Sequence, residues 1–449
     1  MKKLQIESFE IQGLFGTDNV LIPFDDGIKI LVGENGIGKT QVLNLFYYIL
    51  TANFYRLIEF EFSTIKLAFR DNQCVEISKS QIGDLIEQTY KSPIIKDFIQ
   101  EFGFSYFEIL RNKFLRGRNS LYKFANNYML SPRGERFPVH RIFRELEDLD
   151  SNNKSSTYIN QWKKIIDNEL KGKEILYFPT YRRVEEDLYN LGFDEFNEEE
   201  LDKNTLIQFG MNDVKKSFKH IQNTINKLLK EGLAQFTKDV LNVVIDEKHP
   251  EENVFEKINE SDIDLILSRV GGLLPDTQKN AIKNIVAGQT LKNPLTVYLL
   301  QKLIEAYEKQ KTLDNAIKAF RDACNKYLSK KKVVYDESAI KIFVSSYKID
   351  NAIDLKYLSS GEKQIISMFS KVYLSELDQR FIILIDEPEL SLSMLWQKKL
   401  LPDIVNSQKC DFLLAVTHSP FIFENELDKY AIGLNEYFLT NFNMIKNYC

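Results

Sequence analysis

Apolar and polar residues alternate at the start of the chain, over residues 4–12. A second short apolar stretch covers residues 20–23, and residues 28–32 form a third. Alternation indicates a strand with one buried face, whereas a short apolar run indicates a strand buried on both faces. We therefore predict three strands, and then a helix over residues 41–50, which follow a glycine-rich turn.

The pattern becomes helical in the middle of the chain, between about residues 202 and 332. Apolar residues recur there at alternating spacings of four and three, in the two series Val214, Phe218, Ile221, Ile225, Leu228 and Leu313, Ile317, Phe320, Cys324, Tyr327. Each series predicts the seam of a helix that packs against another helix. Between the two series, glycines and prolines exclude one uninterrupted coiled coil. Packing inside a helical bundle and a projecting arm are both compatible with these seams.

Strand patterns flank this helical region. Residues 174–178 precede it, and residues 333–335, 340–344, 381–385 and 412–416 follow it. This order predicts an α/β fold, in which a mixed sheet with flanking helices is interrupted by a helical insert or short coiled-coil hairpin. The predicted parts are an N-terminal part of the α/β unit over residues 1–201, the helical insert over residues 202–332, and the C-terminal part of the α/β unit over residues 333–449.

Composition narrows the class of protein without deciding it. The 449 residues are 44% hydrophobic and 27% charged, which is ordinary for a globular protein. The formal net charge is −5, so attraction to nucleic acid would need a local basic surface. No secretion signal is evident, and the apolar runs are far shorter than the roughly 20 residues of a membrane helix. We expect a cytoplasmic protein that does not associate with membranes.

The four cysteines lie far apart in the sequence, and no two form a CxxC pair. Neither a zinc site nor a disulfide framework is therefore predicted. This usage fits a reducing compartment.

A phosphate-binding loop is predicted between the third strand and the first helix. Residues 33–40 have the sequence GENGIGKT and fit the GxxxxGK[ST] pattern. Asn35, Gly36 and Gly38 are expected to bring backbone N–H groups to phosphate oxygens at the helix N-terminus. Lys39 is expected to reach the β- and γ-phosphates of ATP, and the Thr40 hydroxyl to ligate Mg²⁺.

A pair of carboxylates ends the apolar run at residues 381–385. A buried strand of a parallel sheet delivers its last residues to the edge where ligands bind. Asp386 is therefore predicted to hold Mg²⁺, directly or through water, and Glu387 to be the general base that orients the attacking water. Solvated carboxylates after a strand are common in proteins. This pair predicts a nucleotide site only in combination with the phosphate loop.

A serine turn precedes that strand, in the sequence LSSGE over residues 358–362. Here the chain resembles the ABC ATPases, whose signature is LSGGQ. The resemblance implies that Ser359, Ser360 and Gly361 meet the γ-phosphate bound by a second copy, and that two or more copies close around ATP. A plain helix cap is the structural alternative for this turn.

His418 follows the apolar run at residues 412–416 and matches the switch histidine of the same family. The resemblance implies that its side chain contacts the γ-phosphate or the attacking water. A single histidine is otherwise more often structural.

The order of these motifs around a long helical insert resembles the SMC, RecF and OLD-like branch of the ABC ATPases. The sequence DEPELSL over residues 386–392, which continues to Trp396 and Gln397, is similar to OLD-type and related defence ATPases. Those proteins usually have His-Pro where this chain has Ser393 and Met394. A dimer contact attributed to that histidine is therefore not carried over.

Residues 177–183, with the sequence YFPTYRR, resemble a strand-end motif in the ATPase subunits of two-component anti-phage systems such as Septu and PARIS. In one interpretation Arg182 and Arg183 lie near the nucleotide or a partner. In the other they are a pair at the start of a helix that faces solvent.

Basic residues gather between residues 111 and 144, interleaved with aromatic residues. The basic residues are Arg111, Lys113, Arg116, Arg118, Lys123, Arg133, Arg136, Arg141 and Arg144. Such a surface suits a phosphate backbone or an acidic partner. The alternative is a solvated face paired with the acidic residues at 145–150.

Taken together, the motifs and the resemblance predict a slow ATPase that uses Mg²⁺ and acts as sensor and scaffold in bacterial anti-phage defence. Few residues follow His418 and they hold no carboxylate cluster, so a separate nuclease effector is expected to supply any cleavage. The alternative is a RecF- or SMC-like ATPase of DNA repair or chromosome maintenance that binds DNA directly.

Overall fold

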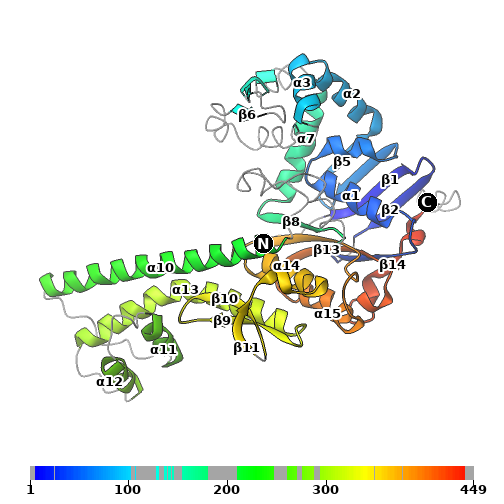
Figure 1. Cartoon of the computed structure of the whole chain (residues 1–449). Helices are drawn as coiled ribbons and strands as arrows, with labels where there is room; N and C mark the ends of the chain where they lie inside the picture. Colours follow the sequence, from blue (N-terminus) through cyan, green and yellow to red (C-terminus); the bar gives the residue numbers. More distant parts are fainter. Residues whose placement is uncertain are drawn as a thin grey trace. The chain divides into compact units, whose positions relative to one another are not determined.

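The computed structural model describes residues 6–24, 26–102, 107, 128–130, 136–138, 140–142, 144–145, 154–180, 210–246, 260–269, 276–287, 294–347, 349–376 and 378–439. The chain forms two compact units (Figure 1). The first unit is Met1–Leu206 with Arg380–Cys449, and the inserted unit is Ile207–Gln379. Residues 333–379 therefore belong to the same compact unit as the helices. The predicted domain boundaries place these residues with the C-terminal strands instead.

An antiparallel sheet in the first unit has the strand order β2-β1-β4-β5. Its strands are β1 (Ile6–Leu14), β2 (Asp18–Pro23), β4 (Thr64–Phe69) and β5 (Cys74–Ser78). Burial alternates along β4 and β5, as expected for strands with one face on the core.

A parallel sheet in the same unit has the order β14-β3-β13-β12-β8. Its strands are β3 (Ile28–Val32), β8 (Lys173–Phe178), β12 (Arg380–Asp386), β13 (Cys410–Thr417) and β14 (Ala431–Gly433). Each neighbouring pair is parallel. All five strands therefore end at the same edge of the sheet, and this confirms the α/β fold class.

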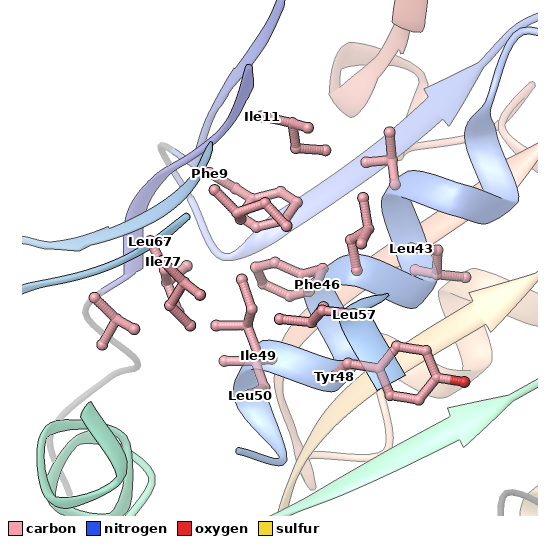
Figure 2. Close-up of a cluster of buried hydrophobic side chains, with 14 of the residues drawn as sticks. Phe9, Ile11, Leu43, Phe46, Tyr48, Ile49, Leu50, Leu57, Leu67 and Ile77 are labelled. Carbon is pink, nitrogen blue, oxygen red and sulfur yellow. The ribbon is translucent and has the colours of Figure 1, made fainter. Parts of the chain in front are cut away.

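Helix α1 (Lys39–Leu50) lies between the two sheets and contributes more buried side chains to the hydrophobic core than any other element of this unit. The Phe46 ring is 5.1 Å from that of Phe9 on β1 and 5.8 Å from that of Phe412 on β13. Figure 2 shows Phe46 and Ile49 among side chains from the antiparallel sheet, including Leu67 and Ile77. The two sheets thus hold the helix in place from both sides. They also fix the position of the loop that precedes the helix.

Shorter elements complete the first unit. They are η1 (Phe54–Glu59), α2 (Lys79–Tyr90), α3 (Pro93–Phe102), β6 (Tyr128–Leu130), β7 (Arg136–Pro138), α7 (Lys154–Glu169), α15 (Met394–Val405), η4 (Pro420–Ile422), η5 (Asp428–Tyr430) and η6 (Leu434–Tyr437). None of the helices within the described ranges is long and apolar enough to cross a membrane.

The inserted unit contains two long helices, α10 (Met211–Asp246) and α13 (Pro294–Asn325), which lie side by side (Figure 1). The two predicted seams face each other, since the Phe218 and Phe320 rings are 5.6 Å apart. Leu228 and Leu313, one in each seam, are half-buried. The other elements are α11 (Glu260–Arg269), α12 (Asp276–Ala287), β9 (Lys331–Asp336), β10 (Lys341–Ser346), β11 (Ile349–Ile353), η3 (Leu355–Tyr357) and α14 (Ser360–Tyr373).

A buried ion pair joins three elements of the inserted unit. Arg269 at the end of α11 donates to Asp314 on α13 at 2.6 Å, and the two side chains are 1% and 0% exposed. Arg269 also donates to Gln310 and to the Tyr335 hydroxyl, which in turn donates to Asp314. Burial, with the hydrogen bond to Asp314, raises the pKa of the Tyr335 phenol. The arginine is thus held by partners on α13 and β9.

We expect Arg269→Met to destabilise the protein by about 3–5 kcal/mol, because it leaves the Asp314 carboxylate buried without its counter-charge. Urea unfolding followed by circular dichroism measures the loss. Arg321→Met is the matched control, since the half-buried Arg321 pairs with the exposed Asp322 and its removal should cost less than about 1 kcal/mol. An equal loss in both variants would contradict the assignment.

Candidate nucleotide site

The predicted phosphate loop lies between β3 and α1. Gly36 and Gly38 have φ values of 89° and 98°, a backbone conformation that side chains disfavour. At Gly38 a Cβ atom would also approach Cε2 of Phe15 to 2.8 Å. The backbone conformation explains glycine at both positions, and the close approach to Phe15 adds a second reason at Gly38. Gly38 is the N-cap of α1, where backbone N–H groups attract anions.

Lys39 is buried, with 5% of the residue exposed. Its ammonium donates to the carbonyl oxygens of Gly33 at 2.6 Å and Glu34 at 2.8 Å. These two hydrogen bonds hold the Lys39 ammonium group against the backbone of the phosphate loop. A phosphate group in the loop would therefore meet a positive charge and the N-terminus of α1 together.

Asp386 receives hydrogen bonds from two hydroxyl groups. Thr40 Oγ1 donates to Oδ1 at 2.9 Å, and Thr180 Oγ1 donates to Oδ2 at 2.9 Å. A hydroxyl beside a carboxylate is the oxygen set with which proteins share Mg²⁺ with phosphates. Over the described ranges, no group of three or more His, Cys, Asp or Glu residues forms a separate metal site. Thr40 and Asp386 fit the predicted ion because they place a hydroxyl and a carboxylate oxygen side by side.

Glu387 follows Asp386 and has a left-handed backbone, with φ 47°. Its N–H donates to the carbonyl oxygen of Val416 on the neighbouring strand at 3.0 Å. A residue other than glycine in this conformation carries strain of about 1–3 kcal/mol, which is typical of functional positions. The turn takes the chain out of the sheet directly after the carboxylate pair.

His418 follows β13, and its side chain is 42% exposed. Its Nδ1 lies 2.9 Å from Oε1 of Glu389. The order of the parallel sheet places the phosphate loop, His418, the carboxylate pair and Thr180 after the neighbouring strands β3, β13, β12 and β8, at one edge. The first unit thus brings together the residues that the sequence predicts for binding and hydrolysis in one copy.

The serine turn belongs to the inserted unit and begins α14. Ser359 and Glu362 form a capping box, in which Ser359 Oγ accepts from the Glu362 N–H and the Glu362 carboxylate accepts from the Ser359 N–H. Burial opposes ionisation of Glu362, but hydrogen bonds from Lys331 and Ser359 outweigh it and lower its pKa. Ser359 and Ser360 are exposed. The helix cap is present, and the contact with a second copy stays a prediction.

Three residues of this site were given no role from the sequence: Thr180, Glu389 and Gln397. Thr180 lies in the YFPTYRR segment after β8, but that resemblance pointed to Arg182 and Arg183 instead. Glu389 and Gln397 lie inside the OLD-like sequence, but only the fold shows what they contact. Arg182 and Arg183 lie outside the described residues, as do Arg111, Lys113, Arg116, Arg118, Lys123 and Arg133 of the basic segment. Arg141 and Arg144 are exposed.

The AAA ATPase domain family, AAA_15, matches residues 4–423, so the chain belongs to this family. Its members are defined by an ATPase domain, in agreement with the phosphate loop and the carboxylate pair. No curated protein matches the sequence.

Among solved structures, the Smc head domain of Pyrococcus furiosus, with an extended coiled coil and bound to the C-terminal domain of ScpA, has a TM-score of 0.34. It is 12% identical, and the match covers 99% of this chain and 98% of that chain. The Smc head domain of Pyrococcus yayanosii, with a coiled coil and joint, has a TM-score of 0.31 and 13% identity, with 93% of both chains covered.

Proposed function

We propose that the chain binds ATP with Mg²⁺, hydrolyses it slowly, and closes as a homodimer or higher homo-oligomer around the nucleotide. The observation that carries this proposal is the hydrogen bond from Thr40 to Asp386, which joins the phosphate loop to the carboxylate pair at one sheet edge. Family membership supports ATP as the substrate. Mg²⁺, held by Thr40 and Asp386, neutralises charge on the phosphates when it is bound.

In this proposal each residue has a separate task. Lys39 and the N–H groups of the loop hold the phosphates, and Glu387 orients the attacking water and takes its proton. Water gives its oxygen to the γ-phosphorus as the bond to the β-phosphate oxygen breaks, and ADP and phosphate leave. Ser359, Ser360 and Gly361 of a second copy complete the site.

The biological role that we propose is a sensor and scaffold in bacterial anti-phage defence, which regulates a separate nuclease effector. Support comes from the sequence alone, through the OLD-like residues 386–392 and the segment 177–183. The RecF- or SMC-like role in DNA repair differs in one testable respect, which is direct binding to duplex DNA.

Reconstitution with the product of the neighbouring reading frame tests this role. The chain alone is expected neither to cleave nor to shift duplex DNA at physiological salt, whereas the neighbouring protein cleaves DNA in a manner that depends on ATP and on this chain. Strong duplex binding by the chain alone, abolished by charge reversal at Arg116 and Arg118, would instead favour DNA repair.

Ser360→Arg is expected to block assembly across ATP and to leave nucleotide binding by the single copy unchanged. The residue is exposed on the first turn of α14, and the capping box uses Ser359 and Glu362 instead. Size-exclusion chromatography with light scattering, with and without ATP, measures the assembly. Asn351→Arg adds the same charge at another exposed position and is the control. Profiles that match the parent's with ATP would overturn the two-copy model.

A further inference from the structure

Glu389 is the second carboxylate after β12, following Glu387, and the proposed hydrolysis does not use it. Its side chain is only 4% exposed. Oε1 accepts a hydrogen bond from the backbone N–H of His418 at 2.9 Å and lies 2.9 Å from Nδ1 of the same residue. Oε2 is buried and has no hydrogen-bond partner in the described part of the chain. The buried Glu389 carboxylate thus makes its two contacts with the same residue, His418.

Gln397 on α15 holds the two loops that meet at this contact. Its amide nitrogen donates to the carbonyl oxygens of Leu392 at 3.0 Å and Glu389 at 3.3 Å, and its amide oxygen accepts from Ser419 Oγ at 2.7 Å. The loop that carries Glu389 and the loop that carries His418 are therefore connected twice within the first unit. Buried hydrogen bonds of this kind fix the orientation of a side chain.

The chemistry of an imidazole follows from which nitrogen carries the proton. A carboxylate only accepts hydrogen bonds, so Glu389 requires a proton on Nδ1 of His418. In the neutral ring Nε2 then carries the lone pair, on the opposite side of the ring from Glu389. Such a nitrogen accepts a hydrogen bond from water and cannot donate one to a phosphate oxygen.

We infer that Glu389 is a positioning residue: it holds His418 as the Nδ1–H tautomer, so that the neutral ring presents Nε2 as an acceptor to the attacking water. This inference rests on the proposed ATP hydrolysis and goes beyond it, because it selects water over the γ-phosphate as the partner of His418. The proton of that water still passes to Glu387.

Nitrogen-15 NMR of the nucleotide-free protein tests the tautomer without reference to activity. The chain has 4 histidines, and the His418 signals are those lost in His418→Gln. The parent is expected to show the Nδ1–H form. Glu389→Met, which has similar volume and no acceptor, should shift His418 to the Nε2–H form, whereas Glu389→Gln keeps an acceptor and should retain Nδ1–H. An Nε2–H signal in the parent overturns the inference.

Turnover supplies the second measurement. Glu389→Met is expected to lower the rate of ATP hydrolysis roughly 10- to 100-fold, by analogy with the loss seen when the partner that orients a metal-ligating histidine is removed, and Glu389→Gln should recover part of it. Glu424→Gln, at an exposed position of the same unit, is the control and should match the parent. If Glu389→Met fails to fold, the inference is tested by the tautomer of His418 in the parent and by the rate of ATP hydrolysis in Glu389→Gln.

A double-mutant cycle separates positioning from a structural role. In a His418→Gln background, Glu389→Met should cause no further loss of turnover, because its effect passes through the histidine. A full additional loss would overturn the inference. Unchanged turnover in the single variant His418→Gln would also overturn the inference. The proposed ATP hydrolysis itself is tested independently, by the Glu387→Gln variant.

Discussion

Glu387→Gln is expected to bind ATP as the parent does and to hydrolyse it about 10²- to 10⁴-fold more slowly. An amide has nearly the shape of the carboxylate but cannot take a proton from water. Binding is retained because the phosphates are held by the loop and by Lys39, and the variant should therefore accumulate as the closed assembly. Phosphate release and light scattering measure the two effects.

Glu436→Gln is the control for this substitution, since it removes an exposed carboxylate of the same unit. Unchanged hydrolysis in Glu387→Gln would remove Glu387 from the role of general base. A loss of both binding and hydrolysis would point to damage in the strained turn instead, and a thermal melt would detect it.

Lys39→Ala is expected to weaken ATP binding by at least about 100-fold. The ammonium offers the phosphates charge-assisted hydrogen bonds, each worth about 1.5–3 kcal/mol, and two of them account for this factor. Titration with a fluorescent ATP analogue measures the affinity. Lys96→Ala removes an exposed lysine of the same unit and should bind as the parent does. Equal affinity in the two variants would contradict the phosphate-loop assignment.

The sequence predicts well those features that depend on neighbouring residues. The third predicted strand, residues 28–32, coincides with β3, and the helix predicted over residues 41–50 falls within α1. The predicted interruption of the helical region is observed, since α11 ends at Arg269 and α12 begins at Asp276, and Pro294 is the first residue of α13, where its missing N–H costs nothing. The phosphate loop and the carboxylate pair are equally local patterns.

Features that depend on the order of strands in the sheet were not predictable in this way. Thr180 meets Asp386 because β8 is the neighbour of β12, and no local pattern contains that pairing. Glu389 meets His418 for a similar reason, since the loops after β12 and β13 lie at one edge. Strands β4 and β5 are not among the predicted strands.

The register of the parallel sheet also bears on how the protein folds. Lys173 pairs with Arg380, so β8 finds its neighbour only after the whole inserted unit has left the ribosome. Pairings this distant in sequence carry a large entropy of loop closure and slow the folding of a domain. The phosphate loop is thus synthesised early, whereas β12 and β13, which carry Asp386 and precede His418, are synthesised late. Nascent chains that stop before Arg380 are expected to require chaperones and to gain no stability from ATP.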